Sequence, residues 1–195
     1  MKELNRRAFL TLTGAALAMM ALTACGADDV PPAPPAPAAP TTSKETDLLT
    51  AINKVWKEKF VAHEVTHEQL TLNQDAVRAI RCYGRVFEKA NETPHQLTTG
   101  DAGIVLQEID GFDAEMQKKY GDNSLAGAAG ISEPSSNRVV ALEDAYSCED
   151  AAVRAFVAKL LDNSNSANAE FISIYLPVVQ GKTYMTAVVF RNNKA

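Results

Sequence analysis

The sequence has 195 residues, with 19 Lys and Arg against 24 Asp and Glu, a formal net charge of −5 and a hydrophobic fraction of 46%. That length allows one domain of ordinary size with appendages, and the hydrophobic fraction excludes a disordered chain. The acidic balance, with no run of Lys and Arg after residue 7, argues against nucleic acid as a partner.

Residues 1–24 have the composition of a signal peptide. Lys2, Arg6 and Arg7 precede an uncharged apolar run of about 16 residues, which is at or below the length that spans a bilayer. Residues 5–10 resemble a twin-arginine signal, and Leu-Thr-Ala-Cys-Gly at 22–26 resembles a lipobox. We therefore expect cleavage before Cys25 and diacylation of its thiol, with palmitate as one acyl chain. An uncleaved N-terminal helix is the alternative.

A lipidated Cys25 would anchor the mature chain to a membrane, because two acyl chains on one residue bind a bilayer stably. The expected location is the cell envelope, on the extracytoplasmic side. Proline and alanine dominate the segment from Pro31 to Pro40, which predicts an extended linker over 25–44. We expect residues 45–195 to form the folded domain.

The first half of that domain predicts helices. Apolar residues recur at helical spacing from Leu48 to Phe60, after a capping box at Thr42-x-x-Glu45. Further helices are expected over 74–89 and around 105–120. The stretch 121–137 is rich in Gly, Ser, Ala and Asn, and therefore predicts a long loop.

The second half predicts strands as well. A short strand is expected over 138–142, followed by a helix that Ser147 caps and that carries apolar residues to Leu161. Residues 171–179 and 183–190 are β-rich and predict a hairpin that turns at Gln180-Gly181. This order predicts an α+β fold with helices packed on a small antiparallel sheet.

His63, Glu64 and His67 form an H-E-x-x-H pattern that resembles zincin metallopeptidases. On a helix, the two imidazoles would share a face and could ligate one zinc ion, with Glu64 activating the bound water. A third ligand is needed, and Glu88 is the one candidate, in surroundings that do not match the family. The alternative is a solvated helix end or loop that contains two histidines.

A second pattern is longer and more dispersed. Leu142-Glu143-Asp144-Ala145-Tyr146 is followed by a capped helix with Phe156, and residues 181–190 read Gly-Lys-Thr-Tyr-Met-Thr-Ala-Val-Val-Phe. Residues 48–53 and 70–73 fit the opening of the same pattern. Over about residues 45–192, the chain resembles the bacterial CAP domains, the superfamily of cysteine-rich secretory proteins, antigen 5 and pathogenesis-related proteins.

The resemblance implies a three-layer α/β/α sandwich with a cleft that holds two His and one or two Glu in the family. Its positions here would be His95, Glu143 and Asp162, where Asp162 replaces a histidine. Such a trio could bind a divalent metal such as zinc, because carboxylates donate oxygen, and a degenerate site without metal is the alternative. The expected function is a binding or interaction module for an unknown ligand, with the zinc metallopeptidase as the competing interpretation.

Cys82 and Cys148 remain once Cys25 is acylated. An even pair in an exported protein can form a disulfide. Closing a loop of about 66 residues would stabilise the fold by roughly 3–4 kcal/mol on the chain-entropy model. The alternative is a pair of buried thiols.

Overall fold

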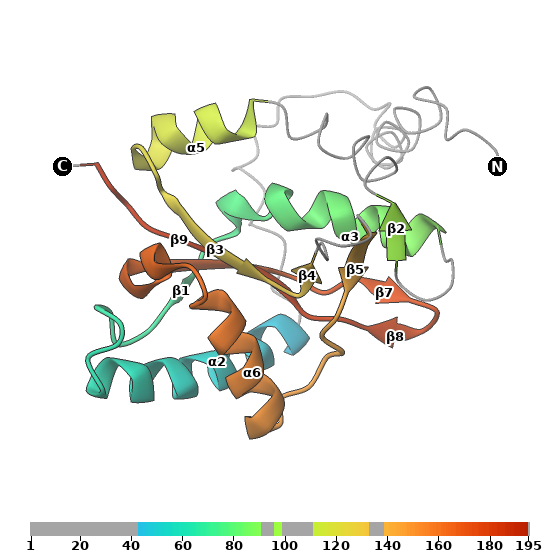
Figure 1. Cartoon of the computed structure of the whole chain (residues 1–195), viewed down its shortest axis with the longest axis horizontal. Coiled ribbons are helices and arrows are strands. Elements are labelled where there is room, and N and C mark those ends of the chain that lie inside the picture. The colour runs from blue at the N-terminus through green and yellow to red at the C-terminus, as the bar shows by residue number, and fades with distance from the viewer. Residues whose placement is uncertain (1–42, 91–95, 99–110, 133–138, 195) are drawn as a thin grey trace, which may run out of the picture. The chain divides into compact units, whose positions relative to one another are not determined.

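The computed structural model describes residues 43–90, 96–98, 111–132 and 139–194 (Figure 1). Residues 41–195 form one compact unit, and only this unit is described below. The predicted signal peptide, Cys25, nearly all of the linker and His95 lie outside the described residues. Within the described ranges, no helix combines the length and apolar character needed to cross a membrane.

The described α-helices lie in parts of the chain predicted to be helical, whereas residues 164–168 were not, and the predicted helix around 105–120 is described only from Phe112. The α-helices are α2 (Ser43–Val61), α3 (Arg78–Ala90), α5 (Phe112–Tyr120) and α6 (Asp150–Leu160), and the 3-10 helices are η2 (Gln74–Ala76) and η4 (Ser164–Asn168). The predicted helix over 74–89 therefore begins as a 3-10 turn. Asn73 caps that turn, because its side chain accepts a hydrogen bond from the Asp75 amide.

The strands of the described residues form three small sheets. They are β1 (Thr71–Leu72), β2 (Gln96–Thr98), β3 (Leu125–Ala129), β4 (Ile131–Ser132), β5 (Val139–Leu142), β6 (Phe171–Tyr175), β7 (Val178–Val179), β8 (Lys182–Thr183) and β9 (Thr186–Phe190). The central sheet has the order β1-β6-β9-β3, the second has the order β2-β5-β4, and β7 pairs with β8. The α+β prediction is confirmed. The central sheet is mixed rather than antiparallel, because β1 pairs with β6 in parallel.

Both faces of the central sheet are covered by helices (Figure 1). Side chains alternate along β6 and β9, as in any strand buried on two faces. One face packs against α2 and α6 through Trp56, Phe156, Ile172, Ile174 and Val189. The opposite face packs against α3 and α5 through Ile80, Phe112, Met116, Val188 and Phe190.

The long loop predicted over 121–137 is wrong for residues 125–132, which form β3 and β4. Gly and Ala have low strand propensity, but close packing demands small residues here. A Cβ on Gly127 would lie 2.3 Å from Ser166 Oγ and 2.6 Å from the Leu160 carbonyl oxygen. Gly130, with a φ of 88°, bends the chain between the two strands.

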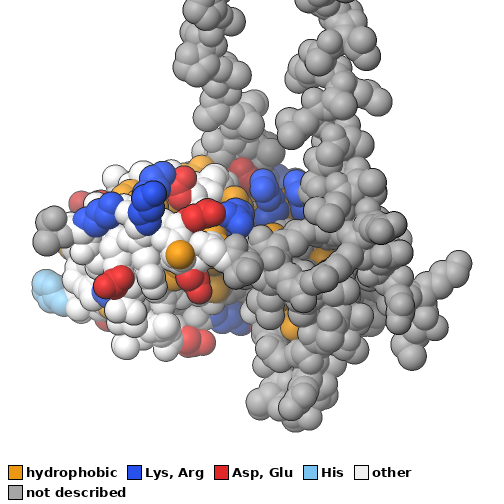
Figure 2. Space-filling view, turned by 90° about the horizontal axis from the view of Figure 1, so that it is seen from above, with side chains coloured by type: hydrophobic (Ala, Val, Ile, Leu, Met, Phe, Trp, Pro, Cys, Tyr) orange, Lys and Arg blue, Asp and Glu red, His pale blue; other side chains and the backbone are white. Residues whose placement is uncertain are grey.

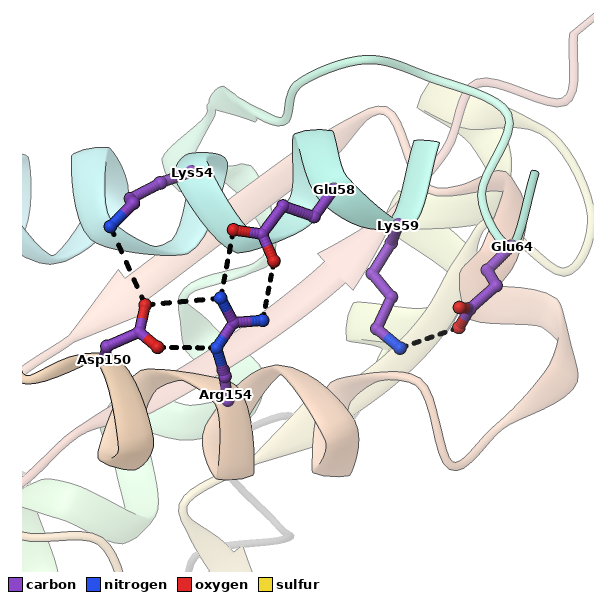
Figure 3. A network of polar contacts seen from close by, with 6 residues as sticks. All are labelled: Lys54, Glu58, Lys59, Glu64, Asp150 and Arg154. Atoms are coloured by element: carbon purple, nitrogen blue, oxygen red, sulfur yellow. Dashed lines mark hydrogen bonds and ion pairs between the residues drawn. The ribbon is translucent and has the colours of Figure 1, made fainter. Parts of the chain in front are cut away.

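Helix α6 is fixed against α2 by an ion-pair network at the surface (Figure 3). The Arg154 guanidinium donates to Glu58 at 2.6 and 3.0 Å and to Asp150 at 2.6 Å. These hydrogen bonds hold the pKa values of both carboxyl groups below their usual range. Exposed pairs of this kind stabilise little, so their main effect is to orient the two helices.

Cys82 and Cys148 are both thiols, and the predicted disulfide between them is absent. Cys82 lies on α3, which packs on one face of the central sheet, whereas Cys148 precedes α6 on the other face. The two cysteines thus belong to elements on opposite faces of the sheet, whereas a disulfide needs Cα atoms within about 7 Å. Nor are both thiols buried, because Cys148 is exposed.

Candidate functional site

The H-E-x-x-H segment lies on the surface beyond the end of α2. The helix ends at Val61, and His63 has a left-handed backbone with a φ of 59°. The motif is therefore not on a helix, and its two histidines do not share a helical face. Both imidazoles are exposed, and a histidine side chain projects from the rim of the described surface in Figure 2.

The side chains of this segment bind their immediate neighbours. Lys59 Nζ lies 2.7 Å from Glu64 Oε2 (Figure 3), and Thr66 Oγ1 lies 3.1 Å from His67 Nδ1. Val65, 4% exposed, anchors the turn in the core. A peptidase would need Glu64 beside the metal, not paired with a lysine.

Glu88, the candidate third ligand, is also engaged elsewhere. Its carboxylate accepts hydrogen bonds from the Tyr175 hydroxyl at 3.0 Å and from the Val178 amide at 2.9 Å. Among the described residues, no group of three His, Cys, Asp or Glu side chains could hold a metal ion. The arrangement that the peptidase interpretation requires is therefore absent from this part of the chain.

Glu143 and Asp162, by contrast, line one cavity of about 350 Å³. Glu143 directly follows β5, and Asp162 lies just beyond the C-terminal end of α6. The rest of the lining comes from β3, the start of β4, the last turn of α6 and the chain just after it, and comprises Gly127, Ala128, Ala129, Gly130, Ile131, Lys159 and Asn163. The structure thus brings together two of the three predicted cleft residues, and the third, His95, lies outside the described ranges.

The backbone around Gly130 fixes the position of Glu143. The Glu143 amide donates to the Gly130 carbonyl at 3.3 Å, and the next carbonyl, that of Asp144, accepts from the Met185 amide at 2.7 Å. Only a glycine allows the backbone at residue 130 to pass so close to Met185, because a Cβ there would lie 1.8 Å from the Met185 carbonyl oxygen. Strand β5 thereby leaves its sheet with Glu143 at the wall of the cavity.

Lys159 is the cation of the site. Its ammonium donates to Glu143 Oε2 and to both oxygens of Asp144, each at 2.9 Å. Partial burial lowers the pKa of Lys159, but the hydrogen bonds to Asp144 and Glu143 outweigh that effect, and the net shift is upward. Lys159 occupies carboxylate oxygens that a divalent metal would need as direct ligands, and no group of three His, Cys, Asp or Glu side chains converges among the described residues, so they do not fit the predicted metal site.

The described charged residues at the cavity are mainly acidic. Glu143, Asp162 and Lys159 line it, and Asp144 pairs with Lys159 just outside the lining, so the charges of these four described residues sum to −2. The C-terminal end of α6 adds the negative pole of its helix dipole. Asn163 is occupied in capping η4, since its side-chain oxygen accepts from the Asn165 amide at 3.0 Å. The electrostatics therefore favour a positively charged ligand group.

Sequence reasoning missed Lys159 and the small residues of β3. Lys159 stands in the last turn of α6, where a basic residue ordinarily signals only a favourable helix dipole. Its partners lie 15 and 16 residues earlier, which no local pattern connects. The Gly and Ala residues over 126–130 carried a signal for close approach of the backbone, but their composition indicated a loop.

Comparison of the chain with protein-family models, with curated proteins and with solved structures found no match.

Proposed function

We propose that this chain is an envelope-anchored lipoprotein whose folded part is a CAP-like binding module, with its ligand site in the cavity at the end of α6. One observation carries the proposal: Glu143 and Asp162, chosen from sequence motifs 19 positions apart, line the same cavity beside Lys159. Polar side chains converging on a concave site are what a ligand pocket requires.

The arrangement of the helices supports the CAP-like part of the proposal. Helices α2 and α6 on one face of the central sheet, with α3 and α5 on the other, agree with a three-layer α/β/α sandwich. The motif over 181–190 coincides with the end of the β7–β8 hairpin and with β9. The parallel pairing of β1 with β6 departs from the antiparallel sheet that we expected.

The chemistry of the cavity suits binding better than catalysis. Lys159 Nζ lies 2.9 Å from Glu143 Oε2, so an ion pair holds the Glu143 side chain at the cavity wall. A general acid or base must reach a proton of the substrate, and Lys159 already occupies this oxygen. A fixed carboxylate is suited to recognising a cationic group.

Fragment binding followed by NMR tests the site. Residues 41–195, which form one compact unit, would be titrated with small amines, carboxylates and neutral amides. We expect an amine to shift the amide signals of residues 127–131 and 159–163, and the double variant Glu143→Gln, Asp162→Asn to lose that response. Glu149→Gln, at the opposite end of α6, is the matched control. Shifts clustered over 61–70 instead, or no shifts, would reject the site.

Metabolic labelling tests the anchor. The full chain should incorporate labelled palmitate in a bacterial host and remain with the membrane fraction, whereas Cys25→Ser should lose the label and be released. Retention of the variant in the membrane would favour the uncleaved N-terminal helix.

A further inference from the structure

We infer that β3 is an edge strand that binds an extended peptide of alternating basic and aliphatic residues. The acidic cavity is one of two cavities that would receive the side chains of this peptide. This inference rests on the proposed function, because it uses the same cavity, and it adds the class of ligand. The peptide would place basic side chains in the acidic cavity and aliphatic side chains on the opposite face of the sheet.

The first support is the position of β3 in the sheets. Strand β3 ends the order of the central sheet, and β4 ends the order of the second sheet. Only Gly130 separates the two strands, so residues 125–132 border both sheets. Among the described residues, no strand pairs with β3 on the side away from β9. An edge strand leaves alternate backbone N–H and C=O groups available to a further strand.

The second support is a cavity on each side of this edge. Besides the acidic cavity, a second one of about 190 Å³ lies between α3 and the strands. Ala128 and Ile131 line both cavities. The other described residues that line the second cavity are all uncharged. They are Ala79, Ile80, Tyr83, Val140 and Val188.

These two environments match the alternation of an extended peptide. Successive side chains of a strand point to opposite faces, so a peptide paired with β3 would direct odd and even residues into different cavities. The acidic cavity, where Glu143, Asp144, Asp162 and Lys159 sum to −2, fits Lys or Arg, and the second cavity, whose described lining is uncharged, fits Val, Ile or Leu. Main-chain hydrogen bonds would supply affinity, and the two cavities would supply specificity.

Strand β3 itself has few of the features that protect an edge from pairing. Its sequence Leu-Ala-Gly-Ala-Ala contains no lysine and no proline, and Ala128 is exposed. A bulge between Leu125 and Gly127 interrupts the register with β9, which leaves residues 127–129 as the regular part. Bulges protect the strand where they occur, so pairing would begin at Gly127.

The test measures the affinity of a fluorescent peptide for the full chain in nonionic detergent by anisotropy. The probe is acetyl-Thr-Lys-Val-Lys-Val-Thr-amide, compared with a version that has Glu for Lys and with one N-methylated at alternate residues. We expect either change to weaken binding by about tenfold or more, since one reverses the charge and the other removes strand hydrogen bonds.

Variants of the protein locate the site. Asp162 is exposed, so Asp162→Lys should fold and weaken binding of the Lys peptide by about tenfold, with Asp162→Asn as the milder second variant. Glu149→Lys makes the same charge change at the other end of α6 and should alter binding less than about twofold.

Each outcome decides the inference. Loss of affinity on N-methylation together with loss in Asp162→Lys supports it. If the N-methylated peptide binds as tightly as the Lys peptide, and Asp162→Lys still abolishes binding, strand pairing is overturned. The cavity would then remain a site for cations. No binding of any peptide, with amine fragments still bound in the cavity, also overturns the inference but not the proposed function. Failure of both peptides and fragments rejects both.

Discussion

Two regions of the molecule carry acidic residues beside lysines, and they differ in what encloses them. In the turn over 61–70, Glu64 pairs with Lys59 at the surface, and Glu68 pairs with Lys57 at 2.6 Å. At the end of α6, Lys159 bridges Glu143 and Asp144, whose side chain is 16% exposed, above the small residues of β3. The first region is a solvated turn, whereas the second surrounds a cavity.

The difference shows that backbone packing, more than residue type, creates a concave site. A histidine doublet on a surface turn has no wall to exclude water, even though its residue types suit a metal. The cavity at α6 exists because Gly127 and Gly130 let the chain pass close to Leu160 and Met185. Substitutions in the two regions should therefore have unequal effects.

The largest effect is expected at Gly130. Gly130→Ala would place a Cβ against the Met185 carbonyl oxygen in a left-handed backbone, and should destabilise the fold by about 3 kcal/mol. Gly181→Ala is the matched control, because its φ is 74° but nothing lies within 4 Å, and it should lose only about 1 kcal/mol. Chemical denaturation measures both values. Equal losses would show that the close approach at Gly130 is unimportant.

A smaller effect is expected from the lysines of the two regions. Lys159→Met should destabilise the fold by about 1 kcal/mol, because it removes the ammonium that hydrogen-bonds to Asp144 and Glu143. Lys57→Met removes a lysine whose side chain is 63% exposed and should change stability by less than about 0.5 kcal/mol. If the two variants unfold at the same denaturant concentration, the enclosed pair is no stronger than the surface pair.

The pH dependence of stability should show part of the Lys159 effect. Because the pKa of Lys159 is raised in the fold above its usual 10.5, the stabilisation is complete below pH 10.5 and is lost as the pH rises through the folded value. The difference in unfolding free energy between wild type and Lys159→Met should therefore be constant from pH 9 to about pH 10.5 and shrink above it, up to pH 12. A difference that stays constant up to pH 12 would contradict the assigned ion pair.

The smallest effect is expected in the histidine turn. His63→Gly relieves a left-handed backbone but makes the unfolded chain more flexible, so stability should change by less than about 0.5 kcal/mol. His67→Gly, where no left-handed backbone is relieved, should destabilise by about 0.5–1 kcal/mol. Bound zinc, measured by atomic absorption, should be the same in both variants and in wild type. Zinc that disappears with His63 would restore the peptidase interpretation.

Local signals predicted most of the secondary structure. The apolar spacing from Leu48 to Phe60 and from Val153 to Leu161 marked α2 and α6 because helices with one buried face repeat at this interval. The Gln180-Gly181 turn was also predictable, and both residues have the positive φ that such a hairpin needs.

Tertiary packing explains what the sequence could not predict. Strand β3 is defined by its neighbours, since Gly127 fits only because Ser166 and Leu160 lie against it. The H-E-x-x-H pattern required a helix over residues 63–67, and that expectation was wrong. Nothing in these five residues specifies that α2 should continue beyond Val61. Glu143 and Asp162 were named through the family resemblance and line the same cavity, whereas the place of Lys159 depends on its contact with Glu143, 16 residues earlier in the chain.

The most direct test is amide hydrogen exchange of the full chain, measured by mass spectrometry with and without the Lys peptide. If the edge beside the cavity is the binding site, exchange should slow over 125–132 and 159–163 and stay unchanged over 61–70. Slower exchange at the histidine turn, with β3 unaffected, would contradict that assignment.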